Sequence, residues 1–440
     1  MNTPFVITRR TALKSAALAA LPAWFVEELR AAEDPPKPTE KPKIALIGCG
    51  GRGRGVAGEA SKFGTVVAVC DVDASHAAAA AKQFNGAKQY ADFRKLLDVE
   101  KGISVIVNGT PDHWHTLVNL AVLKAGKDVY SEKPLTLTID EGKRVVAAVK
   151  ETGRVLQTGS QQRSDPRFRL ACEVVRNGRL GKLTKVTTIL PQGPTGDSFK
   201  TAPIPKELDW NFWQGQAPER EYVPERSHFS FRYWTEYSGG TLTDWGAHHN
   251  DIALWGLGLD RSGPATVDGR LLSVHLRGGY TAPAMYEVTF TYANGVIHRC
   301  ISTTASGITG APSKVWVKPG DQPHGVKFEG EDGWLFVTRG KIEASKPEIL
   351  NDKFTDKDLR LPVSNDHMGN FFECVQSRKK PICEVEIGHR SASLCHLAGI
   401  AVRLGRKLNW DPVKELFVDD KEANAQVARE MRKPWSYETI

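Results

Sequence analysis

Residues 42–160 alternate short apolar runs with amphipathic segments. The apolar runs are typical of buried strands, and apolar positions recur between them at helical spacing. This βαβ alternation predicts a doubly wound parallel sheet of Rossmann type over 43–160. The predicted strands lie at 43–50, 65–73, 103–110, 128–134 and 155–160, with helices at 54–63, 74–84, 117–126 and 139–153.

After about residue 165 the alternation stops and strand-like runs dominate, at 182–190, 284–304 and 333–338. The second run contains Asn294-Gly295 between two alternating stretches, which predicts a hairpin. From His367 onward the pattern is helical, and its apolar spacing predicts a tail that packs back on the body. We therefore expect a second α/β domain over 161–440.

The N-terminus has the three parts of an export signal. Residues 8–14 resemble the twin-arginine consensus, with Ala12 where phenylalanine is usual. An apolar stretch at 16–21 and small residues at 31–32 follow. A basic amphipathic helix on a cytoplasmic protein is the alternative interpretation.

The export interpretation predicts a twin-arginine signal peptide over 1–32, a linker rich in Pro, Lys and Glu over 33–42, and a periplasmic or otherwise exported protein that uses the twin-arginine machinery. No internal stretch approaches the roughly 20 apolar residues that a membrane span requires, so we expect none in the mature protein.

Composition supports a well-filled globular core, with 40% hydrophobic and 25% charged residues in 440. The net charge is +8, but the basic residues are spread among acids, so we expect no nucleic-acid partner. The seven cysteines show no C-x-x-C pair and fall mostly in apolar patterns, which predicts core thiols. A disulfide among Cys374, Cys383 and Cys395 remains open.

A glycine-rich turn joins the first predicted strand to a helix. Gly48, Gly50 and Gly53 form a G-x-G-x-x-G pattern, and with Gly51 and Arg52 they are expected to hold the pyrophosphate of a dinucleotide at the helix N-terminus. A glycine-rich turn that only packs strand against helix is the alternative.

The next predicted strand runs into Asp71, which can accept the ribose hydroxyls of NAD and repel the 2′-phosphate of NADP. Arg52 or Arg54 could still receive that phosphate, so NADP remains an alternative to NAD. Ligands of such sheets bind beyond the carboxyl ends of the strands. The predicted strand ends place three short segments there: Thr110-Pro111-Asp112, Glu132-Lys133-Pro134 and Ser160-Gln161.

The stretch 239–251 reads as a glycine turn opening a helix. Asp244, His248 and Asp251 stand at i, i+4 and i+7, on one face, whereas His249 is turned about 100° away. A carboxylate beside an imidazole can orient it as a general base for an alcohol proton. The ammonium of Lys133 can stabilise the oxygen that forms as hydride leaves.

Two other interpretations compete for these residues. A buried Asp–His pair can simply cap a helix. A metal site is the second alternative, which we do not predict, with ligands drawn from His113, His115, His248, His249 and Asp251. His367, His389 and His396 are expected to be core or cap residues.

Aromatic residues gather in the segment before this helix. Flat rings stack on the apolar faces of sugars. We predict Trp213, Tyr233 and Asp251 as substrate contacts, with core packing as the alternative for the two aromatic residues.

Five motifs resemble the glucose-fructose oxidoreductase / inositol dehydrogenase family, called Gfo/Idh/MocA. They are IALIGCGGRGRG at 44–55, TPDHWH at 110–115, SEKPL at 131–135, GGTLTDWGAHHND at 239–251 and the tail from 365 to 412. The resemblance implies a Rossmann domain and a second α/β domain with a large open, mostly antiparallel sheet, with the active site between them.

The resemblance also implies site residues. Lys133, Asp244 and His248 match the family's catalytic set, with His248 as acid/base, Lys133 as proton relay and Asp244 as orienting carboxylate. His115 matches the cofactor-side histidine. A homodimer or homotetramer is common in the family.

These features predict an NAD(P)-dependent oxidoreductase acting on a sugar or sugar derivative. Twin-arginine export carries folded proteins, and no NAD(H) pool exists outside the cytoplasm, so we expect the cofactor to be tightly bound and recycled in place. A redox-neutral NAD-dependent glycoside hydrolase would satisfy the same demand. A non-catalytic carbohydrate-binding protein is the alternative from another class.

Overall fold

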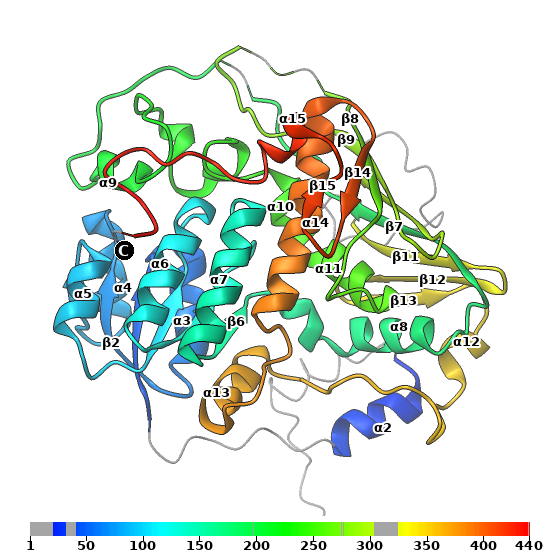
Figure 1. The fold of residues 1–440 in the computed structure, drawn as a ribbon. Helices are drawn as coiled ribbons and strands as arrows, with labels where there is room; N and C mark the ends of the chain where they lie inside the picture. The colour runs from blue at the N-terminus through cyan, green and yellow to red at the C-terminus, as the bar shows by residue number, and fades with distance from the viewer. Residues whose placement is uncertain are drawn as a thin grey trace, which may run out of the picture.

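A computed structural model describes residues 21–31, 41–196, 198–273, 275, 277–302, 324–438 and 440. Within them the chain forms two sheets, one parallel and one mostly antiparallel, that lie side by side (Figure 1). The twin-arginine motif at 8–14 and most of the predicted linker fall outside the described residues.

The first sheet is the predicted doubly wound parallel sheet, with strand order β3-β2-β1-β4-β5-β6. Its strands are β1 (Lys43–Ile47), β2 (Thr65–Cys70), β3 (Lys88–Tyr90), β4 (Val105–Asn108), β5 (Asp128–Ser131) and β6 (Leu156–Thr158). Its helices are α3 (Gly51–Ala60), α4 (Ala74–Gln83), α5 (Phe93–Val99), α6 (Asp112–Lys124) and α7 (Ile139–Thr152).

Apolar side chains cover both faces of this sheet, as a parallel sheet requires. Along β1, Ala45 and Ile47 pack with α5, α6 and α7, whereas Ile44 and Leu46 pack with α3 and α4. Helix α13 (His367–Ser377) returns from the second domain and adds its aromatic residues to the face of α3. The two domains are therefore interlocked by the chain.

The second sheet has the order β13-β12-β11-β7-β10-β9-β8-β14-β15, and within it only β7 and β10 pair in parallel. The strands are β7 (Leu183–Leu190), β8 (Thr266–Leu271), β9 (Tyr286–Thr291), β10 (Ile297–Ser302), β11 (Gly325–Gly330), β12 (Gly333–Thr338), β13 (Lys341–Ala344), β14 (Leu408–Asp411) and β15 (Leu416–Phe417). Strands β9 and β10 form the predicted hairpin around Asn294-Gly295. The open, mostly antiparallel sheet implied by the family is confirmed.

Helices α8 (Pro166–Arg176), α11 (Gly246–Leu257) and α14 (Val385–Leu404) pack on one face of this sheet. Figure 1 shows α14 standing between the two domains. There it lies against α7 so closely that a Cβ at Gly142 would be 2.0 Å from Nδ1 of His389. The absence of a side chain at Gly142 thus fixes the approach of the domains.

Helix α2 (Ala23–Ala31) falls inside the predicted signal peptide and packs against the second domain. Phe25 is fully buried, and Glu28 forms ion pairs with Arg169 and Arg360. Figure 1 shows this helix beneath α8, beside the turn of chain that holds α12 (Glu348–Asn351). The structure therefore uses this segment as part of its core.

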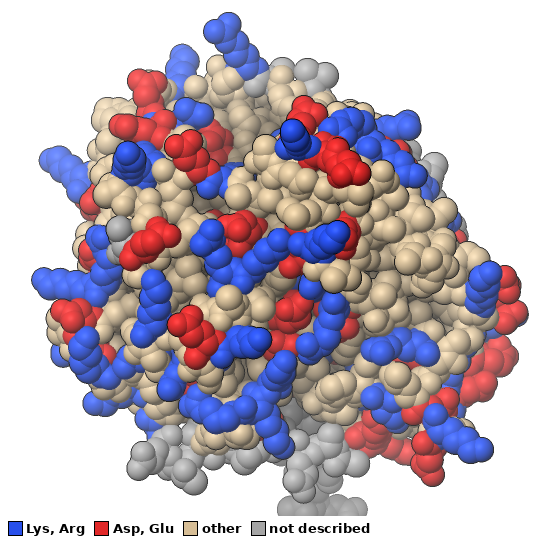
Figure 2. All heavy atoms as spheres, in the orientation of Figure 1, with Lys and Arg blue, Asp and Glu red and all other residues tan. Residues whose placement is uncertain are grey.

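All seven cysteines are free and buried, as predicted for core thiols. Within the described ranges, no helix has the length and apolarity needed to cross a bilayer. On the face drawn in Figure 2, blue basic and red acidic side chains are interspersed.

Candidate functional site

A cavity of about 750 Å³ lies between the two domains. Its wall in the first domain consists of residues that follow the parallel strands, including Gly48 after β1, Asp71 after β2, Thr110 after β4 and Glu132 after β5. The second domain closes the other side with segments around α9 (Trp210–Gln214), the turn at 228–232, α10 (Thr241–Asp244) and Arg339. The cavity thus occupies the place where doubly wound sheets bind ligands.

The glycine-rich turn has the shape of a phosphate cradle. Gly48 has φ +87°, and a Cβ at Gly53 would meet the Gly48 carbonyl oxygen at 1.9 Å. Gly50 and Gly51 have open space where a Cβ would stand, at the start of α3. The backbone can therefore approach a pyrophosphate at the N-terminus of α3, and the residues present fit a dinucleotide.

Asp71 follows β2, where the sequence predicts contact with the ribose of NAD. Its carboxylate accepts hydrogen bonds from the backbone N–H of Cys49 (2.6 Å) and of Asp73 (2.9 Å), which hold it in place. Burial raises the pKa of Asp71, and the hydrogen bonds from both N–H groups oppose that shift. Arg52 is held by Glu132, with 2.8 Å between Nε and Oε1, at the end of β5.

The remaining predicted cofactor residues line the same cavity. His115 lies between two carbonyls, with Nδ1 2.7 Å from Pro134 O and Nε2 2.9 Å from Thr110 O, so it joins the loops after β4 and β5. Pro111 caps the N-terminus of α6, and Gln161 lies beyond β6. His115 thus shapes the cofactor wall.

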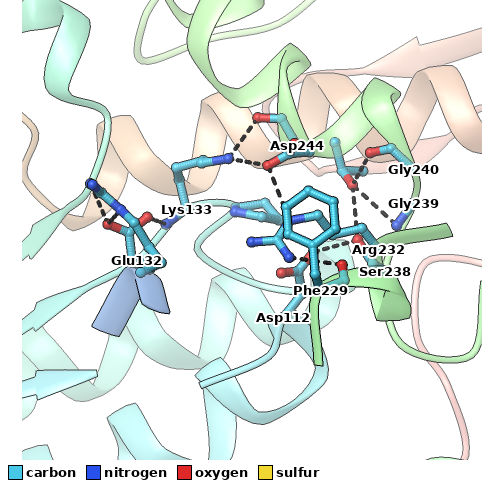
Figure 3. A network of polar contacts seen from close by, with 12 residues as sticks. Asp112, Glu132, Lys133, Phe229, Arg232, Ser238, Gly239, Gly240 and Asp244 are labelled. Carbon is cyan, nitrogen blue, oxygen red and sulfur yellow. Dashed lines mark hydrogen bonds and ion pairs between the residues drawn. The ribbon is translucent and has the colours of Figure 1, made fainter. Parts of the chain in front are cut away.

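Lys133 and Asp244 form an ion pair across the domain interface. The Lys133 ammonium also donates to the Asp244 backbone carbonyl at 3.0 Å, and Arg232 approaches the same carboxylate, with Nε 3.7 Å from Oδ1 (Figure 3). Burial alone would raise the pKa of Asp244, but the charges of Lys133 and Arg232 outweigh it, so the pKa is lowered. Asp244 is therefore ionised and holds both cations at the substrate end.

His248 lines the cavity from α11, one turn beyond Asp244. Burial lowers its pKa well below the usual value, and the charges of Lys133 and Arg339 act in the same direction. Nδ1 has no hydrogen-bond partner among the described residues. A neutral imidazole in this position can accept a proton.

The residues of the alternative metal site are not brought together. His113 is buried, with Nε2 2.9 Å from the Trp213 carbonyl oxygen, and the nitrogens of His115 both face carbonyls. His249 turns away from the cavity, as its spacing predicts, and pairs with His324 at 2.9 Å. Neither His113 nor His249 lines the cavity.

Two predicted substrate contacts lie elsewhere. Asp251 is fully buried in a bidentate ion pair with Arg163, 2.8 Å for each hydrogen bond, and also accepts from Ser391. Tyr233 packs on Tyr280, with ring centroids 5.1 Å apart, outside the cavity lining. The prediction for Asp251 is wrong, because a core arginine already neutralises its carboxylate. Tyr233 is only partly buried and feels the charges of Asp244 and Arg232, so its role as a substrate contact stays a prediction.

Trp213 does line the cavity, although only 4% of it is exposed, and it stacks on Trp210. His367, His389 and His396 are hydrogen-bonded core residues, as predicted.

Two further residues line the cavity: Asp112, at one of the predicted strand ends, and Arg339, which the sequence pattern did not single out. Asp112 is buried at the start of α6 and accepts a hydrogen bond from Ser238 (Figure 3). Arg339 comes from the turn between β12 and β13 and lies over the Trp245 ring, 4.9 Å from its centroid. No local motif marks Arg339, whereas Asp112 was predicted here because it follows the strand at 103–110.

A second contact between the domains lies beside Asp71, the predicted ribose contact. His228 lies with Nε2 3.4 Å from the Asp73 carboxylate and with its ring 4.5 Å from that of His76. Among the described residues, these three are the one group of His, Cys, Asp and Glu side chains that converge in the way metal ligands do. His76 and His228 both line the cavity.

Comparison with protein families gives two matches. Residues 42–160 match the model for GFO_IDH_MocA, described as the oxidoreductase family, NAD-binding Rossmann fold. Residues 192–316 and 323–437 match the model for the C-terminal alpha/beta domain of that family.

Relatives of known name include inositol 2-dehydrogenase 2 of Saccharopolyspora erythraea, 36% identical over 32% of this chain and 42% of the relative. The scyllo-inositol 2-dehydrogenase (NAD(+)) of Bacillus subtilis is 28% identical over 64% of this chain and 70% of the relative. The match thus spans less than half the length of the first relative.

Solved structures of the same fold include the WlbA dehydrogenase of Bordetella pertussis in complex with NADH and UDP-GlcNAcA. Its TM-score is 0.63 at 19% identity, over 84% of this chain and 99% of that one. A levoglucosan dehydrogenase in complex with NADH and levoglucosan also has a TM-score of 0.63, at 17% identity and the same coverage.

Proposed function

Because the chain belongs to the Gfo/Idh/MocA oxidoreductase family, we propose that it is an NAD-dependent oxidoreductase acting on a secondary alcohol of a sugar or cyclitol. The observation that carries the proposal is the meeting of Lys133, Asp244 and His248 at one end of the cavity that the glycine turn opens. Relatives named as inositol dehydrogenases and a neighbour named as a levoglucosan dehydrogenase support the substrate class.

Different residues at the cofactor end would bind different parts of NAD. The turn from Gly48 to Gly53 would hold the pyrophosphate, and Asp71 the adenosine ribose. Asp71 has lone pairs left after accepting two backbone hydrogen bonds, and its negative charge disfavours a 2′-phosphate. When bound, NAD supplies the acceptor for a hydride from the alcohol carbon.

Side chains of the protein would accept the hydroxyl proton of the substrate and stabilise the charge that its removal leaves. His248 would take the hydroxyl proton from the substrate, because burial keeps its imidazole neutral and leaves it a lone pair. The same burial and the charges of Lys133 and Arg339 lower its pKa and so make it a weaker base. The Lys133 ammonium lies beside the reacting end and stabilises negative charge on that oxygen. Asp244 keeps Lys133 and Arg232 in position through its ionised carboxylate.

We further propose that the cofactor stays bound between turnovers. The support is the contact of His228 with Asp73 and His76, because it places a segment of the second domain over the ribose end of the cavity. Retention would allow export through the twin-arginine pathway with the cofactor in place. Export and assembly into a homodimer or homotetramer stay predictions, tested by cell fractionation and by the mass in solution.

The experiment starts from freshly purified full chain. Nucleotide is released by denaturation and identified, and the native protein is then assayed with a panel of sugars and cyclitols for formation of NADH. NAD in the protein and sugar-dependent reduction are the expected results. Absence of both, with added NAD failing to bind, would contradict the proposal. Release of phenol from an aryl glycoside without net reduction would identify redox-neutral cleavage instead.

A further inference from the structure

Two cations lie against the Asp244 carboxylate, and a third, Arg339, lines the same cavity close enough for its charge to act on that carboxylate. Lys133 and Arg232 both lie against Asp244. The charge of Arg339 also lowers the pKa of Asp244, after those of Lys133 and Arg232. No ion pair joins Arg339 to an Asp or Glu within the described part of the chain. Burial and the charge of Arg52 lower the pKa of Arg339, while the charges of Asp244 and Asp165 act on it in the opposite direction.

The other acids that line the cavity are committed elsewhere. Glu132 holds Arg52 at 2.8 Å, and Asp71 accepts backbone hydrogen bonds at the ribose end. Asp112 accepts from Ser238, and burial raises its pKa. Positive charge at the substrate end therefore exceeds the negative charge that the protein places there.

Contacts with Trp245 and Gln162 hold the Arg339 side chain in place at the cavity wall. Its guanidinium lies over the Trp245 ring, with Cζ 4.9 Å from the centroid. When the Gln162 amide is oriented so that both of its atoms find partners, its oxygen accepts from Arg339 Nε at 3.2 Å and its nitrogen donates to the His248 carbonyl at 3.0 Å. These contacts fix Arg339 beside His248 and leave its terminal nitrogens without an acidic partner. A guanidinium so placed suits a carboxylate or phosphate, which it can bind through two parallel hydrogen bonds.

We propose that Arg339, with Arg232, forms an anion subsite, and that the substrate is an acidic sugar whose carboxylate or phosphate lies near the reacting carbon. The inference rests on the proposed function, and it narrows the substrate class from neutral polyols to anionic sugars. It predicts that turnover prefers an acid over its neutral parent.

The test compares matched substrates on the holoenzyme. Glucuronate and galacturonate are measured beside glucose and galactose, and glucose 6-phosphate separates a phosphate from a carboxylate. We expect kcat/KM to favour one of the anions over its neutral parent by about tenfold or more, the effect of one charged hydrogen-bonding pair. Arg339→Gln should reduce that ratio by a similar factor, and Arg339→Lys should reduce it less, because it keeps the charge and loses the fork. Arg406→Gln is the control, because Arg406 does not line the cavity and forms an ion pair with Asp420 at the surface.

Several outcomes overturn the subsite. They are equal rates on acids and neutral parents, an unchanged ratio in Arg339→Gln, or loss of bound nucleotide from that variant, which would reassign Arg339 to the cofactor. Thermal unfolding of each variant checks the fold. If no sugar is turned over, calorimetry measures whether the three anions bind to the holoenzyme. Because binding needs no hydride transfer, this measurement tests the anion subsite independently of the proposed function. Arg339-dependent binding would support the subsite while the proposed function fails, and absence of binding would refute the subsite.

Discussion

The ammonium of Lys133, at the end of a strand in the first domain, is ion-paired with the carboxylate of Asp244 in the second. The side chains of this pair are 13% and 23% exposed, so the two domains are coupled at the point where chemistry is expected. We predict that Lys133→Met removes turnover by at least about 10²-fold while NAD remains bound, because Lys133 acts on the reacting oxygen. Steady-state kinetics and nucleotide content of the same preparation measure both effects.

Lys143→Met is the matched control, because Lys143 does not line the cavity and donates to the backbone carbonyls of Lys414 and Glu415, the latter at 3.1 Å. It should retain turnover. Full activity of Lys133→Met would show that the ion pair is only structural.

The contact between His228 and Asp73 predicts slow release of the cofactor. His228→Ala removes the imidazole that lies over the ribose end, so NAD should dissociate several-fold faster. Nucleotide retained after extended dialysis measures the effect. His275→Ala is the control, because His275 is exposed and bonds to the Tyr280 carbonyl. Equal retention by both variants would mean that His228 does not hold the cofactor.

Because helix α2 packs on the second domain, we predict that this part of the predicted signal peptide is needed for stability. Phe25→Ala should cost about 3–5 kcal/mol of unfolding free energy, as for other buried phenylalanines, and Glu27→Ala, on the exposed face, about 0.5 kcal/mol or less. Deleting residues 2–32 should lower the Tm strongly, because it removes the contacts of Phe25 and Glu28 with the second domain. N-terminal sequencing of exported protein should then find Phe25 retained.

A stable protein lacking residues 2–32 would contradict this prediction. It would show that the contacts of Phe25 and Glu28 add little to the folded state.

The parallel sheet and its cofactor wall could be predicted because their signals are local. The turn at Gly48 needs a positive φ, and Asp71 follows directly on β2, so neighbouring residues specify both. Spacing along one helix likewise predicted that His248 faces the cavity while His249 turns away.

The failures have a different physical origin. Helical spacing put Asp251 on the face of Asp244, but the helix is interrupted at Trp245, and Arg163 from another segment neutralises Asp251 in the core. Arg339 reaches the cavity from a turn of the second sheet, where only tertiary packing brings it to Trp245. Partners that are distant along the chain leave no periodic signal.

Several histidines are buried in their neutral form, so we predict that the free energy of unfolding decreases in mild acid. Burial lowers the pKa of His113, His298 and His396 to about 3 and that of His367 to about 4. An unfolded histidine titrates near 6.5, so between about pH 6.5 and 4 the unfolded chain binds more protons than the folded one. Stability therefore falls as the pH decreases through this window, by about 1.4 kcal/mol per pH unit for each such histidine.

His298→Gln isolates one of these contributions, because glutamine can still bond to Thr188 and Tyr292, the present partners of the imidazole. Urea unfolding at a series of pH values should give a slope of unfolding free energy against pH that is smaller by about 1.4 kcal/mol per unit in this variant. His275→Gln, at an exposed position, should keep the full slope. Parallel slopes for the protein and His298→Gln would mean that His298 takes up its proton in the folded state, against the direction that its burial dictates.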